Sequence, residues 1–529
     1  MMKGIFLYMT MCVAAIAFAA CTNELEESTV PADNALVLTV DGFPAFQETT
    51  ETRAVGTFDP GKTEWTSGDK VLVRVSSNGS TTQYATLTYE NNTWTTNPTL
   101  TRPESAFTVE AWYAPAYSWS NNELSSTTPG TGEFLHIEQT GLSDRNVTIN
   151  FSSVTRNYSR LRIVCSSGTN LNVSLTDFTP AGNNTSSGTT NIDLTTDDKG
   201  NAYLYGTWAG SSNLDVTYGS TSLVDKNITT ASVENTSYVV DASFATNFPN
   251  ASTYDQIGSG TENCPYILLN GIQFKDFASN GDKAKHYKMD KDIDITDYSN
   301  NWNPGDFSGT LDGGDNAIIG FNYSNSANLF GLFNKNGGII KNLTISFCSI
   351  TNSSSNNNIG TIACSNYGTI ENCHVSGKIS GFNVGGIAAT NYGNIIACSN
   401  SAAITANSGG GICCNCMGNA AFIGCYNTGT INAPDKAGIW RYILISGTIS
   451  TQSCYTTVEN IYGSASSGTA NVTSSYYMNG QAITEHSGAT VANWQAAIDD
   501  MNNTLQSGSY DYRYEMGDNN LPVIRRYTP

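Results

Sequence analysis

The sequence is poor in charged side chains, and basic residues are the scarcer of the two signs. Charged residues make up 13% of the chain, against about 25% in a typical soluble protein. The chain has 25 lysine and arginine residues against 45 aspartate and glutamate residues, and its formal net charge is −20. Nucleic-acid binding needs a basic face. This composition therefore excludes nucleic acid as an expected partner.

Motifs of common enzymes are also missing. The four histidines are His136, His286, His374 and His486. None of them has the His-Glu-x-x-His spacing of a zinc peptidase, and no Gly-x-Ser-x-Gly elbow marks a serine hydrolase. Polysaccharide lyases and hydrolases built on solenoids need clustered carboxylates and bases on one face. We therefore expect no enzymatic activity, no catalytic residue and no cofactor.

One close pair of carboxylates lies in the solenoid part of the chain. Asp312 and Asp315 flank two glycines in a turn-like segment. Aspartate side chains cap tight turns through hydrogen bonds to nearby backbone amides, and carboxylate oxygens also bind calcium. We expect a capped turn here and keep calcium as the alternative.

A long apolar run occurs at the N-terminus. Lys3 precedes an apolar stretch from Ile5 to Ala20, which is typical of a secretory signal and short for a membrane-spanning helix of roughly 20 apolar residues. The run ends in Phe18-Ala19-Ala20-Cys21, which resembles the lipobox of bacterial lipoproteins, although leucine is commoner than Phe18 at its position. The resemblance implies that residues 1–20 are removed and that Cys21 carries the lipid. The alternative is an ordinary signal peptide cut after Ala20.

Residues 21–35 form the expected tether. The stretch Thr22–Glu27 is acidic and resembles the surface-export signal of some Gram-negative lipoproteins; the alternative is a solvated acidic spacer. Each buried methylene of a lipid anchor adds about 0.8 kcal/mol of membrane binding. The two resemblances together imply that the protein is anchored in the cell outer membrane and exposed at the surface.

The cysteines do not form a recognisable disulfide or zinc framework. Of the 13, Cys12 and Cys21 belong to the signal region, which leaves 11. Nine of these lie between Cys348 and Cys454, and no Cys-x-x-Cys pair is matched by a second one. We therefore expect no metal site.

Residues 36–245 contain short strand-like segments and lack helical periodicity. Examples bounded by polar turns are Ala35–Val40, Val71–Val75, Phe107–Ala111, Leu161–Val164 and Tyr238–Val240. Short strands at this spacing predict β-sandwiches. The length of the region predicts two of them, at residues 36–150 and 151–245.

The first of these regions resembles a known family. Trp65–Val71, Trp112–Pro115 and Val147–Phe151 are similar to the fimbrillins, which are lipoprotein-derived subunits of protease-assembled pili. The resemblance implies transthyretin-like sandwiches and cleavage by an Arg-specific protease between Arg53 and Ala54. A strand of a neighbouring subunit then replaces the first strand that cleavage removes. The alternative is that Arg53 is an ordinary exposed loop residue.

The chain changes character at residue 246. Residues 246–327 resemble the N-terminal cap of bacterial surface solenoids, with a short helix expected at Gln273–Ala278 and a strand at Tyr287–Ile295. Beyond them, residues 328–475 repeat. Positions 362, 387 and 412 are all isoleucine, at steps of 25. A fixed period of this length predicts a stacked β-solenoid.

The repeat unit resembles a known surface motif. The segment Asn366–Cys373 recurs as Asn391–Cys398, and each unit also has a Gly-Gly-Ile-like corner. This pattern is similar to the GLUG repeat of surface adhesins and of the N-terminal regions of some secreted immunoglobulin peptidases. Tyr367 and Tyr392 occupy equivalent positions. They either pack beside a turn, which we expect, or present an aromatic stripe to sugars.

The period also aligns the cysteines. Cys373, Cys398, Cys425 and Cys454 follow at equivalent positions, and Leu343 precedes them in the same column. Buried free cysteine behaves as a small apolar residue. The column therefore predicts a stacked apolar core and not catalysis or metal binding.

Residues 476–529 form the expected C-terminal cap. Thr490–Met501 has apolar residues at helical spacing, and Leu521–Ile524 is a predicted strand. We expect the helix to close the end of the solenoid, where it would protect an exposed strand edge.

These features together predict an all-β surface lipoprotein with two sandwiches, a solenoid of about 25-residue repeats and a small helical cap. The expected function is adhesion, as a tip or accessory subunit of a pilus. The expected partners are the outer membrane, other pilus subunits through strand exchange, and a surface receptor, with glycans among the candidates. The alternative is a surface lipoprotein that binds or degrades glycans.

Overall fold

The computed structural model describes residues 34–48, 60–183, 189–298, 302, 305–325, 328–444, 447–465, 468–473, 475–479, 482–485, 490–491 and 493–527. Cys21, Arg53 and Ala54, the expected signal and most of the expected tether lie outside these ranges. Within them the predicted fold class is confirmed: strands dominate, helices are few, and β-sheet domains precede a solenoid. The described helices are all too short or too polar to cross a membrane.

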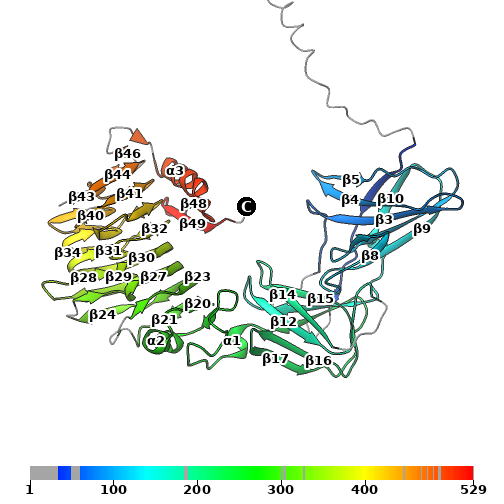
Figure 1. Cartoon of the computed structure of the whole chain (residues 1–529), viewed down its shortest axis with the longest axis horizontal. Helices are drawn as coiled ribbons and strands as arrows, with labels where there is room; N and C mark the ends of the chain where they lie inside the picture. Colours follow the sequence, from blue (N-terminus) through cyan, green and yellow to red (C-terminus); the bar gives the residue numbers. More distant parts are fainter. Residues whose placement is uncertain are drawn as a thin grey trace, which may run out of the picture.

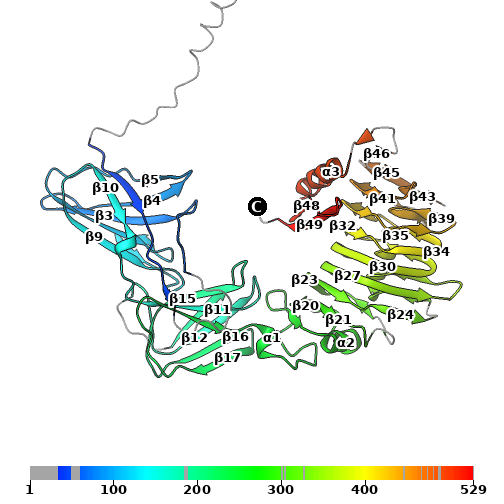
Figure 2. The ribbon, with the colours of Figure 1, turned by 180° about the vertical axis from the view of Figure 1, so that it is seen from behind.

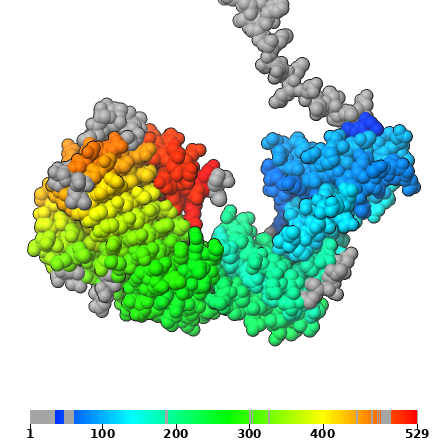
Figure 3. All heavy atoms as spheres, in the orientation of Figure 1, coloured from blue at the N-terminus to red at the C-terminus, as the bar shows by residue number. Residues whose placement is uncertain are grey.

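The molecule has the shape of an open U. The first sandwich and the solenoid form the two arms, and the second sandwich joins them at the base (Figures 1 and 2). The space-filling view shows the hollow between the arms, with the C-terminal segment on its solenoid side (Figure 3).

The first sandwich packs a five-stranded antiparallel sheet against a two-stranded parallel one. The larger sheet has the order β5-β4-β3-β6-β9, and the smaller one pairs β1 with β10. Alternating apolar residues of both sheets fill the core between them. The strands are β1 (Val37–Asp41), β3 (Lys70–Ser77), β4 (Gln83–Glu90), β5 (Thr93–Asn97), β6 (Phe107–Tyr113), β9 (Leu135–Leu142) and β10 (Asn146–Asn150), with an outer hairpin of β7 (Ser118–Ser120) and β8 (Glu123–Ser125).

The second sandwich includes one strand that precedes most of the first sandwich in the sequence. A four-stranded sheet, β14-β12-β16-β17, faces a five-stranded sheet, β13-β15-β11-β18-β2. Strand β2 (Gln47–Glu48) follows β1 closely in sequence, yet it pairs in parallel with β18. The other strands are β11 (Ser159–Val164), β12 (Asn170–Leu175), β13 (Phe178–Pro180), β14 (Thr190–Thr195), β15 (Asn201–Trp208), β16 (Asn213–Tyr218), β17 (Thr221–Asn227) and β18 (Thr236–Asp241).

A helix and short strands lead into the solenoid. After the one-turn helix α1 (Phe244–Asn247), β19 (Tyr266–Leu268) precedes helix α2 (Gly271–Asn280). Helix α2 confirms the predicted helix, and the Asn270 side chain caps it by accepting a hydrogen bond from the Gln273 amide. The predicted continuous strand Tyr287–Ile295 is wrong. It is interrupted after β20 (His286–Met289), and β21 (Ile293–Asp294) pairs separately with the next coil.

The solenoid stacks parallel strands into two long sheets. One sheet has 22 strands and begins at β19; the other has seven. The register confirms the predicted period, because Asn366 lies opposite Asn391 and His374 lies opposite Ser399. The seven-stranded sheet consists of β22 (Asp306–Phe307), β26 (Phe333–Asn336), β29 (Ala363–Asn366), β31 (Ala388–Asn391), β35 (Cys413–Cys416), β40 (Trp440–Ile443) and β43 (Tyr462–Ala465).

The longer sheet carries the main face of the solenoid. Its longest strands are β23 (Thr310–Ile319), β27 (Ile339–Asn352) and β30 (Thr369–Gly385). The shorter ones are β24 (Asn322–Asn325), β25 (Leu329–Phe330), β28 (Asn358–Gly360), β32 (Asn394–Ile396), β33 (Ser399–Asn400), β34 (Ala403–Gly410), β36 (Ala421–Ile423), β37 (Tyr426–Asn427), β38 (Ile431–Asn432), β39 (Asp435–Ala437), β41 (Thr448–Gln452), β42 (Tyr455–Thr456) and β44 (Thr469–Thr473).

The cysteine column lies in the core, as predicted. Cys373, Cys398, Cys425 and Cys454 are fully buried in the same cluster as Leu343. The described cysteines are free thiols. Burial raises the pKa of Cys398 well above its usual value, and its thiol donates to the carbonyl oxygens of Ile396 and Ile370 at 3.2 and 3.5 Å. The column is therefore a buried, apolar part of the core.

The C-terminal region adds strands to the end of the solenoid and packs a helix against its coils. Antiparallel strands β45 (Tyr476–Asn479), β46 (Ala482–Glu485) and β47 (Thr490–Val491) extend the end of the long sheet. Helix α3 runs over Trp494–Ser507, not from Thr490, because the Asn493 side chain caps its first turn. The helix packs on the side of the coils, where Ala497, Ile498 and Met501 meet Ile396 and Tyr455.

A hairpin missing from the sequence prediction follows the helix. Strand β48 (Tyr512–Met516) pairs with β49 (Pro522–Arg526), which begins one residue after the predicted start. Tyr514 fixes the hairpin to helix α3 and to the coils: its amide donates to the Asn502 side chain at 2.7 Å, and its hydroxyl donates to the Gly424 carbonyl at 2.8 Å. The hairpin thereby lies on the side of the solenoid that faces the hollow between the arms (Figure 2).

Candidate functional site

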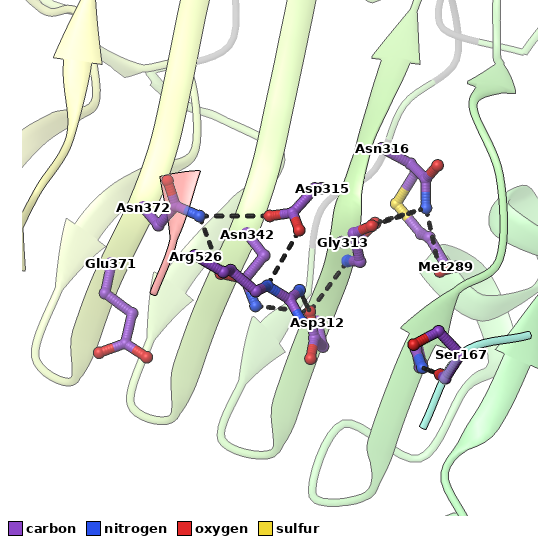
Figure 4. A network of polar contacts seen from close by, with 12 residues as sticks. Ser167, Met289, Asp312, Gly313, Asp315, Asn316, Asn342, Glu371, Asn372 and Arg526 are labelled. Atoms are coloured by element: carbon purple, nitrogen blue, oxygen red, sulfur yellow. Dashed lines mark hydrogen bonds and ion pairs between the residues drawn. The ribbon is translucent and has the colours of Figure 1, made fainter. Parts of the chain in front are cut away.

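A column of polar residues lies on the solenoid face that the C-terminal hairpin covers. Asp315, Asn342 and Asn372 occupy successive coils and have positive φ angles of 64°, 54° and 47°. Asparagine and aspartate tolerate this conformation better than most residues. The side-chain nitrogen Nδ2 of Asn372 donates to Asn342 Oδ1 at 2.9 Å and to Asp315 Oδ1 at 3.3 Å (Figure 4). Nδ2 of Asn342 donates to Asp312 Oδ1 at 2.9 Å.

Arg526 from β49 supplies the positive charge between the two aspartates. Its Nε lies 2.9 Å from Asp315 Oδ2, and its Nη2 lies 3.5 Å from Asp312 Oδ1 (Figure 4). Burial raises the pKa of Asp315 above its usual value, although Arg526 opposes the rise. The Gly314 amide donates to Asp312 Oδ1 at 2.9 Å, which is the expected turn cap. Within the described ranges, no three His, Cys, Asp or Glu side chains come together as a metal site.

His374 lies on the same strand as Asn372 and connects the polar column to Ser399 of the next coil. One ring nitrogen lies 3.0 Å from Asn372 Oδ1 and the other lies 2.7 Å from the Ser399 hydroxyl. Desolvation lowers the pKa of His374 to about 4, so the ring is neutral at pH 7. Because Asn372 Oδ1 can only accept, Nε2 carries the proton and Nδ1 accepts from Ser399. A base this weak activates a serine poorly, since general bases work best with a pKa near the operating pH.

Two adjoining cavities open beside this column. One, of about 420 Å³, lies between the coils and β49 and is lined by Thr344, His374 and Ser399 among others. The second, of about 1000 Å³, lies between the coils, the hairpin and two loops of the second sandwich. Asp315 and Arg526 line both cavities. We call the two together the polar groove.

The walls of the polar groove are tied to one another. The Ser166 hydroxyl donates to Asp290 Oδ1, and Lys288 Nζ donates to the Ser167 carbonyl at 3.4 Å. Ile257 and Ile267 of the segment that leads into the solenoid are buried within the core of the second sandwich. The second sandwich and the first coils therefore share a core, and these contacts fix the walls of the groove relative to one another.

The predicted processing site lies just after a segment with unusual contacts. Arg53 and Ala54 are outside the described residues, as is the lipidation candidate Cys21. The described residues 34–48, which we call the leader, precede them. Leu36, Leu38 and Val40 of the leader are buried in the first sandwich, and β1 pairs with β10 over five residues, from Val37 opposite Asn146 onward.

The leader also reaches the junction of the two sandwiches. Phe46 is 3% exposed, and the guanidinium carbons of Arg156 and Arg160 lie 3.9 and 4.5 Å from its ring centroid. Arg156 pairs with the buried Glu133 at 2.8 Å and donates to the Pro44 carbonyl, also at 2.8 Å. Sequence reasoning missed this junction, because nothing in a lone Phe46 marks it as an anchor between domains.

The tyrosine ladder packs on itself. The rings of Tyr367 and Tyr392 are stacked, with 4.1 Å between centroids and 9° between planes. Lys335 Nζ lies 4.5 Å from the centroid of the Tyr367 ring. Tyr392 and Lys335 therefore both pack against the Tyr367 ring. The packing interpretation of this ladder is therefore favoured.

Comparison with known proteins gives distant matches only. No protein-family model matches the chain, and no curated protein matches it. Solved structures that resemble it include a proposed immunoglobulin A1 protease from Bacteroides ovatus, with 19% identity, a TM-score of 0.37 and coverage of 51% of this chain and 94% of that one. A proposed cell adhesion protein from Bacteroides fragilis has 9% identity, a TM-score of 0.24 and coverage of 40% and 93%. A shaft pilin from Lactobacillus rhamnosus GG has 14% identity, a TM-score of 0.17 and coverage of 40% and 97%.

Proposed function

We propose that this chain is a cell-surface adhesion protein that is exported, lipidated at Cys21 and incorporated into a pilus as a tip or accessory subunit. The outer membrane holds it through the lipid before assembly. Its function requires no catalysis. A GLUG-like solenoid presents the adhesive surface, and a fimbrillin-like first sandwich makes the assembly contact.

The observation that carries this proposal is the placement of β1. The strand pairs in parallel with β10 in a sheet of two strands, and cleavage between Arg53 and Ala54 would remove it together with the rest of the leader. The buried positions of Leu36, Leu38 and Val40 would then become an open apolar groove beside an unpaired edge of β10. Such an edge is a template for a strand from another chain.

The other end of the chain supports an accepting role. The last described strand, β49, is fixed along the solenoid by the Arg526 ion pairs and by Tyr426, whose hydroxyl donates to the Pro522 carbonyl at 2.6 Å. A strand held in this way is not free to insert into a neighbour. The subunit would therefore accept a strand without donating this one, which supports our proposal of a position at a pilus end with the solenoid outermost.

N-terminal sequencing of surface filaments tests the proposal. Filaments sheared from cells should contain a chain that begins at Ala54, and Arg53→Ala should block its incorporation while lipidation continues. Arg525→Ala, a change of an arginine whose side chain is 68% exposed, is the matched control and should assemble normally. A mature chain in filaments that still begins at Cys21, or no association with filaments, contradicts the proposal.

A second candidate function is favoured by the polar groove. A surface lipoprotein that binds glycans without forming part of a pilus would need a recognition surface across several coils. The residues Asp315, Asn342, His374 and Ser399 supply one from successive coils. Cells that display the uncleaved, lipid-anchored chain and still bind glycans would support this candidate.

A further inference from the structure

The larger cavity of the polar groove carries charges of both signs. Asp198, Asp290 and Asp511 line it together with Lys199 and Lys288, in addition to the Arg526–Asp315 ion pair. Asp198, Lys199 and Asp511 are exposed. A site for a simple anion or cation is dominated by one sign of charge. Here the signs nearly balance, so the groove does not select a ligand by net charge.

Donors and acceptors alternate within reach of one another. Carboxylates accept only, and lysine and arginine donate only. Ser166, Ser167 and Asn316 on the same walls add groups that can do both. A hydroxyl group donates one hydrogen bond and accepts others. A ligand with many hydroxyls on one rigid frame therefore fits this mixture better than an apolar molecule or an ion does.

An aromatic ring stands at the edge of the cavity. Tyr527 lines it and is 49% exposed. The Arg513 guanidinium carbon lies 4.9 Å from the centroid of the Tyr527 ring, and the Tyr527 amide donates to the Asp511 carbonyl at 2.8 Å. These contacts hold an amphipathic side chain that offers an apolar surface and a hydroxyl.

We infer that the polar groove is a binding site for a neutral oligosaccharide, whose hydroxyls hydrogen-bond to the mixed polar lining and whose ring carbons pack on Tyr527. The walls are tied through Ser166–Asp290 and Lys288–Ser167, so little ordering is needed when the ligand binds. The inference rests on the proposed adhesive function by naming the class of receptor that the solenoid side of the molecule recognises.

Binding by the uncleaved chain, from residue 21 onward, tests the inference. The protein is made with Cys21→Ser, so that it stays in solution, and is titrated with neutral hexasaccharides of glucose, mannose, galactose and N-acetylglucosamine and with an anionic heparin hexasaccharide. We expect at least one neutral sugar to bind, with the same affinity at 50 and 500 mM salt (roughly 14 and 4 Å of screening length). Tyr527→Ala should weaken binding about tenfold or more, and Tyr527→Phe by about twofold at most.

Matched variants distinguish groove binding from other surfaces. Asp198→Ala and Asp511→Ala should each weaken binding by about fivefold or more, as expected for lost hydrogen bonds to a ligand. Tyr367→Ala, which removes a 46% exposed tyrosine outside the groove, should leave binding unchanged. Failure of all the neutral sugars, binding of heparin alone, or equal binding by wild type and Tyr527→Ala overturns the inference.

The inference and the proposed function can fail separately. Sugar binding through the groove by a chain that never enters filaments would support the inference and contradict pilus assembly. Cleavage and filament assembly by a chain that binds none of the sugars would support pilus assembly and contradict the inference.

Discussion

The ring of Phe46 lies beneath the guanidinium group of Arg156, with 3.9 Å between the guanidinium carbon and the ring centroid. The two residues come from different parts of the chain: Phe46 belongs to the leader, and Arg156 begins the second sandwich and pairs with Glu133 of the first region. Both sandwiches therefore contain part of the leader. Its strand β1 completes the first sandwich, and its continuation closes the junction with the second.

Removal of the Phe46 ring should loosen that junction. Phe46→Ala creates a cavity and uncovers the guanidinium groups of Arg156 and Arg160, which are otherwise buried against the ring. Core phenylalanine-to-alanine changes cost about 3–5 kcal/mol. We expect a lower unfolding midpoint and faster amide exchange in β2 and β18. Phe347→Ala removes a phenylalanine that is 80% exposed and should change neither; an equal effect of the two variants would refute the anchoring role.

The solenoid could be predicted because its determinants are local and repeated. A step of 25 residues sets the register, so the sequence alone aligns Cys373 with Cys398 and His374 with Ser399. The burial of the cysteines follows from that alignment. The strands of the sandwiches could also be predicted, since alternating apolar residues mark β3 and β11 without reference to the rest of the chain.

The polar groove and the contacts of the leader could not be predicted, because they join distant segments. Arg526 contacts Asp312 although the two residues are far apart in the sequence. Strand β2 pairs with β18 although nearly all the other strands of both sandwiches lie between them in the sequence. Neither contact leaves a periodic signal. The helix start was misplaced for a local reason: apolar spacing continues through Val491, whereas the Asn493 cap decides where α3 begins.

The cysteine column should tolerate small apolar replacements but not charge. Cys398→Ala leaves a small void and should cost on the order of 1 kcal/mol. Cys398→Asp places a carboxylate at a position with no exposed surface, where an unpaired charge costs several kcal/mol. We expect its solenoid to fail to fold, as measured by thermal melting and by secreted yield. Asn394→Asp introduces the same group at an exposed position of a neighbouring strand and should melt like wild type.

Acid should destabilise the solenoid through His374. Its pKa is about 4 in the folded protein against an ordinary value of 6.5, so the unfolded chain takes up a proton more readily. The contribution of His374 to the free energy of unfolding is therefore fully present above pH 6.5. It falls as the pH drops towards 4, by at most about 1.4 kcal/mol per pH unit. His374→Gln should remove that part of the slope, measured as the difference between denaturant titrations of the two proteins. Parallel curves for wild type and variant would contradict the assignment.

Lipidation should depend on one residue. Cys21→Ser removes the thiol that the lipobox resemblance assigns to the lipid, so the variant should move from the membrane fraction to the soluble fraction. Cys165→Ser, a change of a buried free thiol in the second sandwich, should leave the protein with the membrane. Unchanged fractionation of Cys21→Ser would favour an ordinary signal peptide.

Arg526 should determine whether the aspartate pair responds to calcium. In the wild type its guanidinium group already lies between Asp312 and Asp315 and offsets one of their two negative charges, so millimolar calcium should not raise the melting temperature. Because the Arg526 side chain is 45% exposed, its ion pairs contribute little to global stability, about 0–1 kcal/mol. Arg526→Ala should therefore fold. Its β49 should exchange amide protons faster, because the strand loses its ion pairs with the coils and keeps the Tyr426–Pro522 hydrogen bond.

The same variant leaves two carboxylates close together without a cation. Their repulsion favours any cation that oxygen ligands accept, so Arg526→Ala should gain thermal stability from calcium where wild type does not. Arg525→Ala, the adjacent residue with a more exposed side chain, should behave as wild type in both respects. A calcium-dependent rise in the wild-type melting temperature that Asp315→Asn abolishes would show instead that calcium binds despite Arg526, and that the ion pair is not what satisfies this turn.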